Sequence, residues 1–322
     1  MEPGQSRPII TITLNPALDV STAVDVVTPE HKLRCDAAVR EPGGGGINVA
    51  RVCDRLGAEV TALTVVGGAV GRQLVSLLEE EGITTVPVAS DDETRQCFAV
   101  QERSTDRQYR FVLPGRPLDL ALIDAVGEAV CRLVALLRDR SAEPLVVMSG
   151  SVPPETEAGA VERLISAFQP ADVIVDTSGP ALVEALRCPV LLVKPSAREL
   201  QSVVGRRLDD ESQILAGAKE VLAGSAARAL LVSVGAGGAM LVRHGGDPVR
   251  LRAPAVRVRS AVGAGDSLVG GLTVGLSRSY DLQRAAALGI AAGTATVISA
   301  GSGLCAAADV DDLLPLVTAA PA

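Results

Sequence analysis

Short apolar segments alternate with longer stretches of helical periodicity along most of this chain. Near-continuous apolar runs are typical of strands buried on both faces, and such runs occur at residues 9–14, 60–68, 144–150, 172–178, 189–196 and 229–235. After the first run, Ile47, Ala50, Cys53 and Leu56 recur on one helical face, and Gly57 can end that helix. The alternation predicts an α/β fold with a doubly wound, mostly parallel sheet flanked by helices. Ligands of such folds bind at the carboxyl ends of the strands.

Two segments depart from this pattern. Residues 20–40 and 94–114 alternate apolar and polar positions without helical period, which is typical of antiparallel strands with one solvated face. We expect them to form a small antiparallel β-sheet that acts as a lid over the site, and its uncovered apolar face would suit a homodimer. The alternative is a pair of edge strands without a function. Because no linker or repeat interrupts the pattern, residues 1–322 are predicted to form a single domain plus this lid.

Composition narrows the possible partners. The 322 residues include 30 basic and 38 acidic side chains, so the net charge is −8 with histidine neutral. An acidic chain without Trp lacks both the attraction and the stacking surfaces for nucleic acid, so we expect neither nucleic acid nor a membrane as a partner. Residues 285–308 carry no charge, but Ala, Gly, Ser and Thr dominate there, which favours a buried helix over a membrane span.

Motifs that are missing exclude several classes of enzyme. The sequence contains no G-x-x-x-x-G-K-[ST] of a P-loop and no G-x-S-x-G of an α/β-hydrolase. No G-x-G-x-x-G follows the first apolar run, which argues against a nicotinamide or flavin oxidoreductase. The six cysteines form no C-x-x-C pair and the first residues do not resemble a secretory signal, so we expect reduced thiols and a cytoplasmic location.

A glycine cluster at residues 261–267 precedes an apolar helical run. Glycines there allow close approach of the backbone, and free N–H groups at a helix N-terminus bind anions. Asp266 stands in the first turn, and a carboxylate beside an anion site makes sense if it accepts the proton of a hydroxyl that attacks phosphorus. An aspartate that merely caps the helix is an equally good interpretation of this local pattern.

A second cluster, residues 43–46, places four glycines before a helix, where Asn48 offers donors and acceptors to hydroxyl groups. A flexible loop is the alternative. Asp19 follows the first strand and is another hydroxyl acceptor, or a turn aspartate. Near the expected lid, Lys32, Arg34, Arg95 and Arg110 could supply a local positive field for a sugar phosphate, although each alone suits a solvated surface.

The ordered motifs resemble the PfkB (ribokinase-like) carbohydrate kinases over nearly the whole chain. Residues 43–51 match one family signature and residues 262–267 match the other, with 149–154, 193–200 and 233–238 between them in family order. Gly45 replaces the lysine of the usual G-G-K-G, as in members that phosphorylate fructose 6-phosphate, and residues 11–19, 32–35 and 108–112 match the same members. Ser196 stands where many of these kinases have asparagine.

This resemblance implies a role for individual residues. Asp266 would be the base on the sugar 1-hydroxyl, and the N–H groups of Gly263, Ala264 and Gly265 the anion hole. The sugar phosphate would contact Asp19, Lys32 (from a partner's lid), Gly44, Gly45, Asn48, Arg95, Arg110 and Ser151. The ATP site would be lined by Lys194, Ser196, Ser233, Gly235 and Gly238. Glu199 would hold magnesium through water, although an ordinary first-turn glutamate is the alternative, and Ser260, Val262 and Gly301 would lie around a potassium ion.

The implied reaction is transfer of the γ-phosphoryl group of ATP, with Mg²⁺ and K⁺, to the 1-hydroxyl of fructose 6-phosphate. Tagatose 6-phosphate and fructose 1-phosphate are alternative acceptors, because they differ from it only in stereochemistry or in the position of the phosphate. A non-catalytic sensor of sugar phosphates on the same scaffold is a further alternative.

Overall fold

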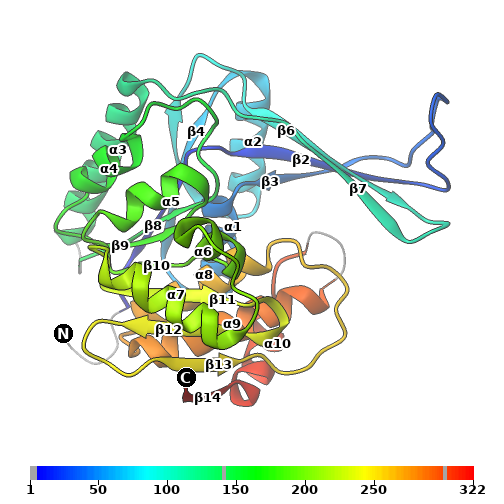
Figure 1. The fold of residues 1–322 in the computed structure, drawn as a ribbon. Helices are drawn as coiled ribbons and strands as arrows, with labels where there is room; N and C mark the ends of the chain where they lie inside the picture. Colours follow the sequence, from blue (N-terminus) through cyan, green and yellow to red (C-terminus); the bar gives the residue numbers. More distant parts are fainter. Residues whose placement is uncertain (1–5, 140–142, 300–302) are drawn as a thin grey trace.

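A computed structural model describes residues 6–139, 143–299 and 303–322. Its main sheet has the strand order β14-β13-β12-β11-β10-β9-β8-β1-β4-β5, and the strands from β11 to β5 are parallel (Figure 1). The parallel strands are β1 (Ile9–Thr13), β4 (Val60–Val66), β5 (Thr84–Ala89), β8 (Leu145–Ser149), β9 (Asp172–Asp176), β10 (Leu192–Val193) and β11 (Ala229–Ser233). The expected doubly wound, mostly parallel sheet is therefore confirmed.

Three antiparallel strands extend one edge of this sheet: β12 (Ala239–Arg243), β13 (Val249–Arg252) and β14 (Thr318–Pro321). These three strands were not predicted from the sequence, and neither was β5 at the opposite edge. β5, β13 and β14 carry polar or exposed residues, so they lack the continuous apolar run of a central strand, whereas β12 is buried over its first four residues and was missed despite such a run.

Helices cover both faces of the sheet. One apolar core lies under α3 (Leu120–Arg138), α4 (Ala160–Ala167), α5 (Gly179–Leu186), α6 (Ala197–Val204) and α7 (Glu211–Ala223). The other lies under α1 (Gly45–Arg55), α2 (Gly68–Glu80), α8 (Ala264–Ser277), α9 (Leu282–Ile298) and α10 (Ala307–Leu313). The charge-free segment beginning at Ala285 forms most of α9, a buried helix as expected. Within the described ranges, no helix has the length and apolarity that crossing a membrane requires.

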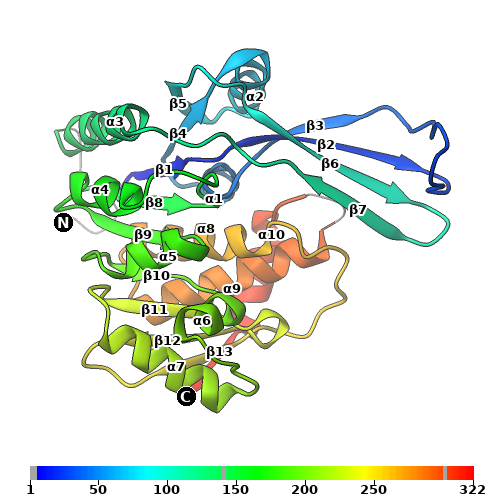
Figure 2. The same cartoon turned by 45° about the horizontal axis from the view of Figure 1, so that its top comes forward.

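A second, small sheet has the order β3-β2-β6-β7 and projects from the main body (Figures 1 and 2). It consists of β2 (Ala17–Val24), β3 (Val39–Gly43), β6 (Arg95–Glu102) and β7 (Arg107–Val112). The β2/β3 and β6/β7 pairs are antiparallel as expected, whereas β2 and β6 pair in parallel. The strands also differ in extent from the predicted segments, because β2 begins at Ala17 and residues 25–38 form no strand.

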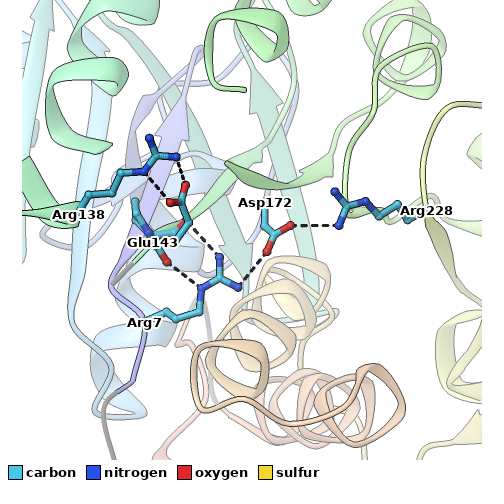
Figure 3. A network of polar contacts seen from close by, with 6 residues as sticks. Arg7, Arg138, Glu143, Asp172 and Arg228 are labelled. Carbon is cyan, nitrogen blue, oxygen red and sulfur yellow. Dashed lines mark hydrogen bonds and ion pairs between the residues drawn. The ribbon is translucent and has the colours of Figure 1, made fainter. Parts of the chain in front are cut away.

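An ion-pair network joins the amino-terminal ends of the main strands (Figure 3). Arg7 donates to the Asp172 carboxylate at 3.0 Å and to the Glu143 carbonyl at 2.8 Å, and Arg228 lies 3.4 Å from the other Asp172 oxygen. Arg138 pairs with the Glu143 side chain. The network ties the start of β1 to the starts of β8 and β9, at the edge opposite to the carboxyl ends where ligands are expected.

Replacing Asp172 by alanine is expected to lower the free energy of unfolding by about 1–2 kcal/mol, because Arg7, only 16% exposed, would lose its carboxylate. The matched change Glu128→Ala breaks a pair with Arg132 in which both side chains are 71% exposed, and should leave stability unchanged within error. Denaturant melts of the two variants check this. Equal losses in both would contradict a structural role for the Asp172 network.

Candidate active site

Polar residues gather where β1, β8, β9, β10 and β11 end. Ser149 ends β8, Asp176 ends β9, Lys194 follows β10 and Ser233 ends β11. The amino ends of α1 and α8 lie on the same side, and α1 and α8 pack against each other. The carboxyl edge of the sheet thus collects the polar groups of a site, as the fold class predicts.

Asp266 lies in the first turn of α8, and Asn48 of α1 donates to its Oδ2 at 2.8 Å. The preceding Gly263 has φ of 75°, and a Cβ there would lie 2.8 Å from the Leu304 side chain. Glycine is therefore favoured by the backbone conformation, whereas the end of the Leu304 side chain can shift to admit a Cβ. The first backbone N–H groups of a helix have no intrahelical acceptor, so the segment 263–265 presents donors beside the carboxylate, although the Ala264 nitrogen also lies 3.5 Å from the Ala261 carbonyl oxygen.

Burial raises the pKa of Asp266 to about 7, and the negative charges of Asp176 and Asp19 add to this effect. The Asn48 hydrogen bond and the Lys194 ammonium act in the opposite direction. A carboxyl group with this pKa can take up and release a proton near neutral pH, which is the property that a general base requires.

A buried ion pair supports this carboxylate and was not predicted from the sequence. Lys194 Nζ lies 3.0 Å from Asp176 Oδ1, and the two side chains are 7% and 14% exposed. Burial opposes the charge of Lys194, but Asp176, with Glu199 and Asp266 nearby, raises the pKa of the ammonium. Lys194 therefore stays charged, and its Nζ lies close to Gly265 at the start of α8. The position of Asp176 at the end of an apolar run was the available signal.

The glycine cluster of residues 43–46 is packed against neighbouring backbone. A Cβ on Gly45 would lie 2.5 Å from the Gly150 nitrogen, and one on Gly46 would lie 2.4 Å from the Ile12 carbonyl oxygen. Gly44 adopts φ of 121° at the N-cap of α1. The cluster is therefore a rigid close approach of backbone, not the flexible loop that was the alternative.

Gly45→Ala is expected to destabilise the protein by about 1–3 kcal/mol, because the new methyl group overlaps the Gly150 backbone. Gly224→Ala is the matched control, since its methyl group would make only ordinary contacts at 3.8 Å and beyond. Thermal denaturation of both variants measures the difference. A Gly45→Ala variant as stable as the control would contradict the tight packing.

Asp19 lies on β2 against Gly43, whose missing side chain leaves room for the carboxylate. Burial raises the pKa of Asp19, while Arg110 and Arg95 counteract the rise. A cavity of about 1000 Å³ between the small sheet and residues 257–262 is lined by Asp19, Arg110, Ser260 and Val262, among others. These residues, expected to contact sugar and potassium, thus share one cavity.

Arg95 and Ser151 come together through the β1–β2 connection. Arg95 donates to the backbone carbonyls of Asn15, Pro16 and Leu113 at 3.0, 3.3 and 2.7 Å. Asn15 in turn donates from its side chain to the Ser151 hydroxyl at 3.0 Å. Carbonyl oxygens orient the guanidinium without neutralising it, so Asn15 links a cation and a hydroxyl, two kinds of donor that suit an anion site.

The expected nucleotide residues also meet. Ser196 and Ser233 form a parallel bridge between neighbouring strand ends, and Val234–Gly238 makes a tight turn that contains Gly235. Ser196 caps α6, and the Glu199 carboxylate accepts the Ser196 N–H at 2.6 Å in a capping box. Glu199 therefore has the capping role that was the alternative, and only one of its oxygens is used in it.

Two sets of predicted residues are only partly placed. Ser260 and Val262 are linked by a hydrogen bond of 3.3 Å, and the Ser260 backbone meets the end of α9. Gly301 lies outside the described residues. Lys32 is exposed in the β2–β3 connection, which lies at the far end of the small sheet in Figure 1, so a single chain does not bring it to the site.

In the described part of the chain, no group of three or more His, Cys, Asp or Glu side chains is suited to a metal ion.

Known proteins resemble this chain in both sequence and fold. The family described as "pfkB family carbohydrate kinase" matches residues 10–309. The ATP-dependent 6-phosphofructokinase isozyme 2 of Mycobacterium tuberculosis (strain CDC 1551 / Oshkosh) is 41% identical over 318 residues, which cover 97% of this chain and 90% of that protein. The structure of phosphofructokinase-2 from Escherichia coli with potassium has a TM-score of 0.89 and 38% identity, covering 96% and 99% of the two chains. The complex of that enzyme with fructose-6-phosphate has a TM-score of 0.86, 37% identity and the same coverage.

Proposed function

Because this chain belongs to the pfkB family of carbohydrate kinases, we propose that it transfers the γ-phosphoryl group of ATP to the 1-hydroxyl of fructose 6-phosphate. The observation that carries this proposal is the place of Asp266. It stands beside the N-terminal N–H groups of α8, where a phosphoryl group would bind, and Asn48, which follows the glycine cluster of residues 43–46, donates a hydrogen bond to it. One carboxylate thus lies between the expected donor and acceptor.

Each part of the site has a function in this reaction. The N–H groups at 263–265 and the Lys194 ammonium would stabilise the charge on the transferred phosphoryl group, since fixed dipoles need no reorganisation. An alcohol is too weakly acidic for Asp266 to ionise it beforehand, so Asp266 would orient the 1-hydroxyl and accept its proton late. Closure of the small sheet would exclude water, which otherwise competes as acceptor.

The residues present fit the expected ions. Glu199 has a second oxygen beyond the one in its capping box, and a carboxylate oxygen suits a water of hydrated Mg²⁺ that arrives with ATP. Ser260 and Val262 offer hydroxyl and carbonyl oxygens, which are suitable ligands for K⁺. Magnesium would shield and polarise the phosphates when bound, while the protein groups hold it in place.

We also infer a homodimer formed through the small sheet. Phe98 and Phe111 are cross-strand neighbours on it and are 38% and 56% exposed, which favours a covered face. A second chain would also be needed to bring Lys32 to a site. Sedimentation of the purified protein tests this, and a monomer at all concentrations would overturn it. The cytoplasmic location stays a prediction.

Coupled release of ADP tests the activity. The acceptors are fructose 6-phosphate, tagatose 6-phosphate, fructose 1-phosphate and unphosphorylated sugars, each with and without potassium. Release that depends on fructose 6-phosphate, with the highest kcat/KM in the panel, supports the proposal. Preference for another phosphosugar would make that sugar the substrate, and the absence of acceptor-dependent ADP release with every acceptor would favour a sensor.

The rate of the reaction should fall as pH is lowered through about 7, because protonated Asp266 cannot accept a proton. With a pKa of about 7 for Asp266, kcat/KM should drop about tenfold from pH 8 to pH 6, whereas an ordinary aspartate would titrate near pH 4. Sugar phosphates titrate near pH 6, so the profile is repeated with unphosphorylated fructose. A flat profile with both acceptors would contradict the role of Asp266.

A further inference from the structure

Asn15 lies at the junction of the elements that surround the phosphate-binding end of the sugar site. It connects β1 to β2, and its side chain is buried, with 7% exposure. Its carbonyl oxygen accepts from Arg95, and its side-chain Nδ2 donates to Ser151. A Cβ on Gly115, just beyond β7, would lie 2.1 Å from Asn15 Oδ1, so the missing side chain of Gly115 leaves the room that the amide occupies.

The direction of the Asn15–Ser151 hydrogen bond determines what Ser151 can do. A serine hydroxyl has one proton to donate and two lone pairs that accept. Because Asn15 Nδ2 donates at 3.0 Å, it uses a lone pair of Ser151 Oγ and leaves the proton available. Ser151 is exposed whereas Asn15 is buried, so the hydroxyl proton of Ser151 can point away from Asn15 toward a ligand. The arrangement presents Ser151 as a donor, which is what an anion needs.

The main chain of the same residue orients Arg95. Three guanidinium nitrogens of Arg95 donate to carbonyl oxygens, at Asn15, Pro16 and Leu113. A guanidinium has five N–H groups, so two remain for a ligand. Neutral acceptors fix the plane of the group but leave its positive charge intact, unlike a carboxylate partner.

We propose that Asn15 is a positioning residue for the phosphate of a ketose-phosphate substrate, because it aligns the Ser151 hydroxyl through its side chain and the Arg95 guanidinium through its carbonyl. The role rests on the proposed function, since it assumes a phosphorylated sugar. Asn15 does not itself need to contact the substrate. Its effect therefore appears in the affinity for the phosphate and not in the transfer at the 1-hydroxyl.

Two substitutions of Asn15 separate this role from simple packing. Asn15→Ala removes the donor and should raise KM for fructose 6-phosphate about tenfold, with kcat within about twofold of wild type. Asn15→Asp keeps the size, but a carboxylate only accepts, so the Ser151 hydroxyl would donate to it instead of to the phosphate, which the new charge would also repel. This near-isosteric variant should raise KM about a hundredfold. Thermal melts verify that both variants are folded.

The acceptor and a double-mutant cycle provide the controls. With unphosphorylated fructose as acceptor, both Asn15 variants should keep kcat/KM within about twofold of wild type. Ser151→Ala combined with Asn15→Ala should raise KM no more than Ser151→Ala alone, since the side chain of Asn15 acts through Ser151. Additive effects, an unchanged KM in Asn15→Asp, or an equal loss with unphosphorylated fructose would each overturn the proposal.

The wild-type protein in the same series tests the proposed function separately. If it prefers another phosphosugar, the substrate assignment fails, and the same cycle run with that sugar still decides the role of Asn15. If it releases no ADP with any acceptor, calorimetric titration of fructose 6-phosphate into the wild type and the two Asn15 variants decides. A dissociation constant that rises in Asn15→Asp supports positioning, and one that does not change overturns it.

Discussion

Asp266→Asn is expected to lower kcat by between about a hundredfold and ten-thousandfold, while the dissociation constant of ATP changes by less than about threefold. The amide keeps the shape of the side chain and can still bond to Asn48, which donates to Asp266 at 2.8 Å. It cannot accept the proton of the sugar hydroxyl. Steady-state turnover gives kcat, and calorimetric titration with a non-hydrolysable ATP analogue gives the affinity.

Asp19→Asn is the matched control, because it makes the same chemical change on the other carboxylate proposed to contact the sugar. Asp19 lies against Gly43 and is assigned to holding hydroxyl groups, so its replacement should mainly raise KM for the sugar. If Asp266→Asn turned over at a near-normal rate, or if both variants lost kcat equally, the assignment of Asp266 as base would be wrong.

The main sheet could be predicted because its central strands leave a strong signal. Buried parallel strands need apolar residues on both faces, so the runs at residues 9–14 and 172–178 identified β1 and β9 without reference to other elements. Edge strands such as β14 have no such requirement. The parallel pairing of β2 with β6 could not be predicted either, because the relative direction of the two strands depends on how the two excursions leave the main sheet.

The site was predictable to the extent that its chemistry lies in local motifs. The segment ending in Asp266 and the glycines before Asn48 are contiguous patterns, and the structure brings them within hydrogen-bonding distance although they are 218 residues apart. Asp176 carries no motif of its own, and Asn15 lies in the matched segment 11–19 but was given no role there. Each acts through a partner distant in sequence, Lys194 or Ser151, so their roles emerge only when the strand ends are assembled. The capping box of Ser196 and Glu199 was readable from the S-x-x-E spacing.

Lys194→Met is expected to have the second large effect, on stability as well as on activity. It would leave the Asp176 carboxylate buried without its cation, since the two groups are 3.0 Å apart and 7% and 14% exposed. Removing one partner of a buried pair costs about 3–5 kcal/mol. The positive charge beside Gly265 would also be lost, so turnover should fall together with the midpoint of denaturation.

The double variant Lys194→Met with Asp176→Asn separates the two effects. It removes both charges, and replacing a whole buried pair by neutral groups costs far less than breaking it, so most of the lost stability should return. Activity should not return, because no ammonium then faces the phosphoryl group. Guanidinium melts and coupled ADP release measured on the single and double variants test this. A double variant as unstable as Lys194→Met would mean that the lysine stabilises the fold by packing, and recovery of turnover would mean that its charge has no part in phosphoryl transfer.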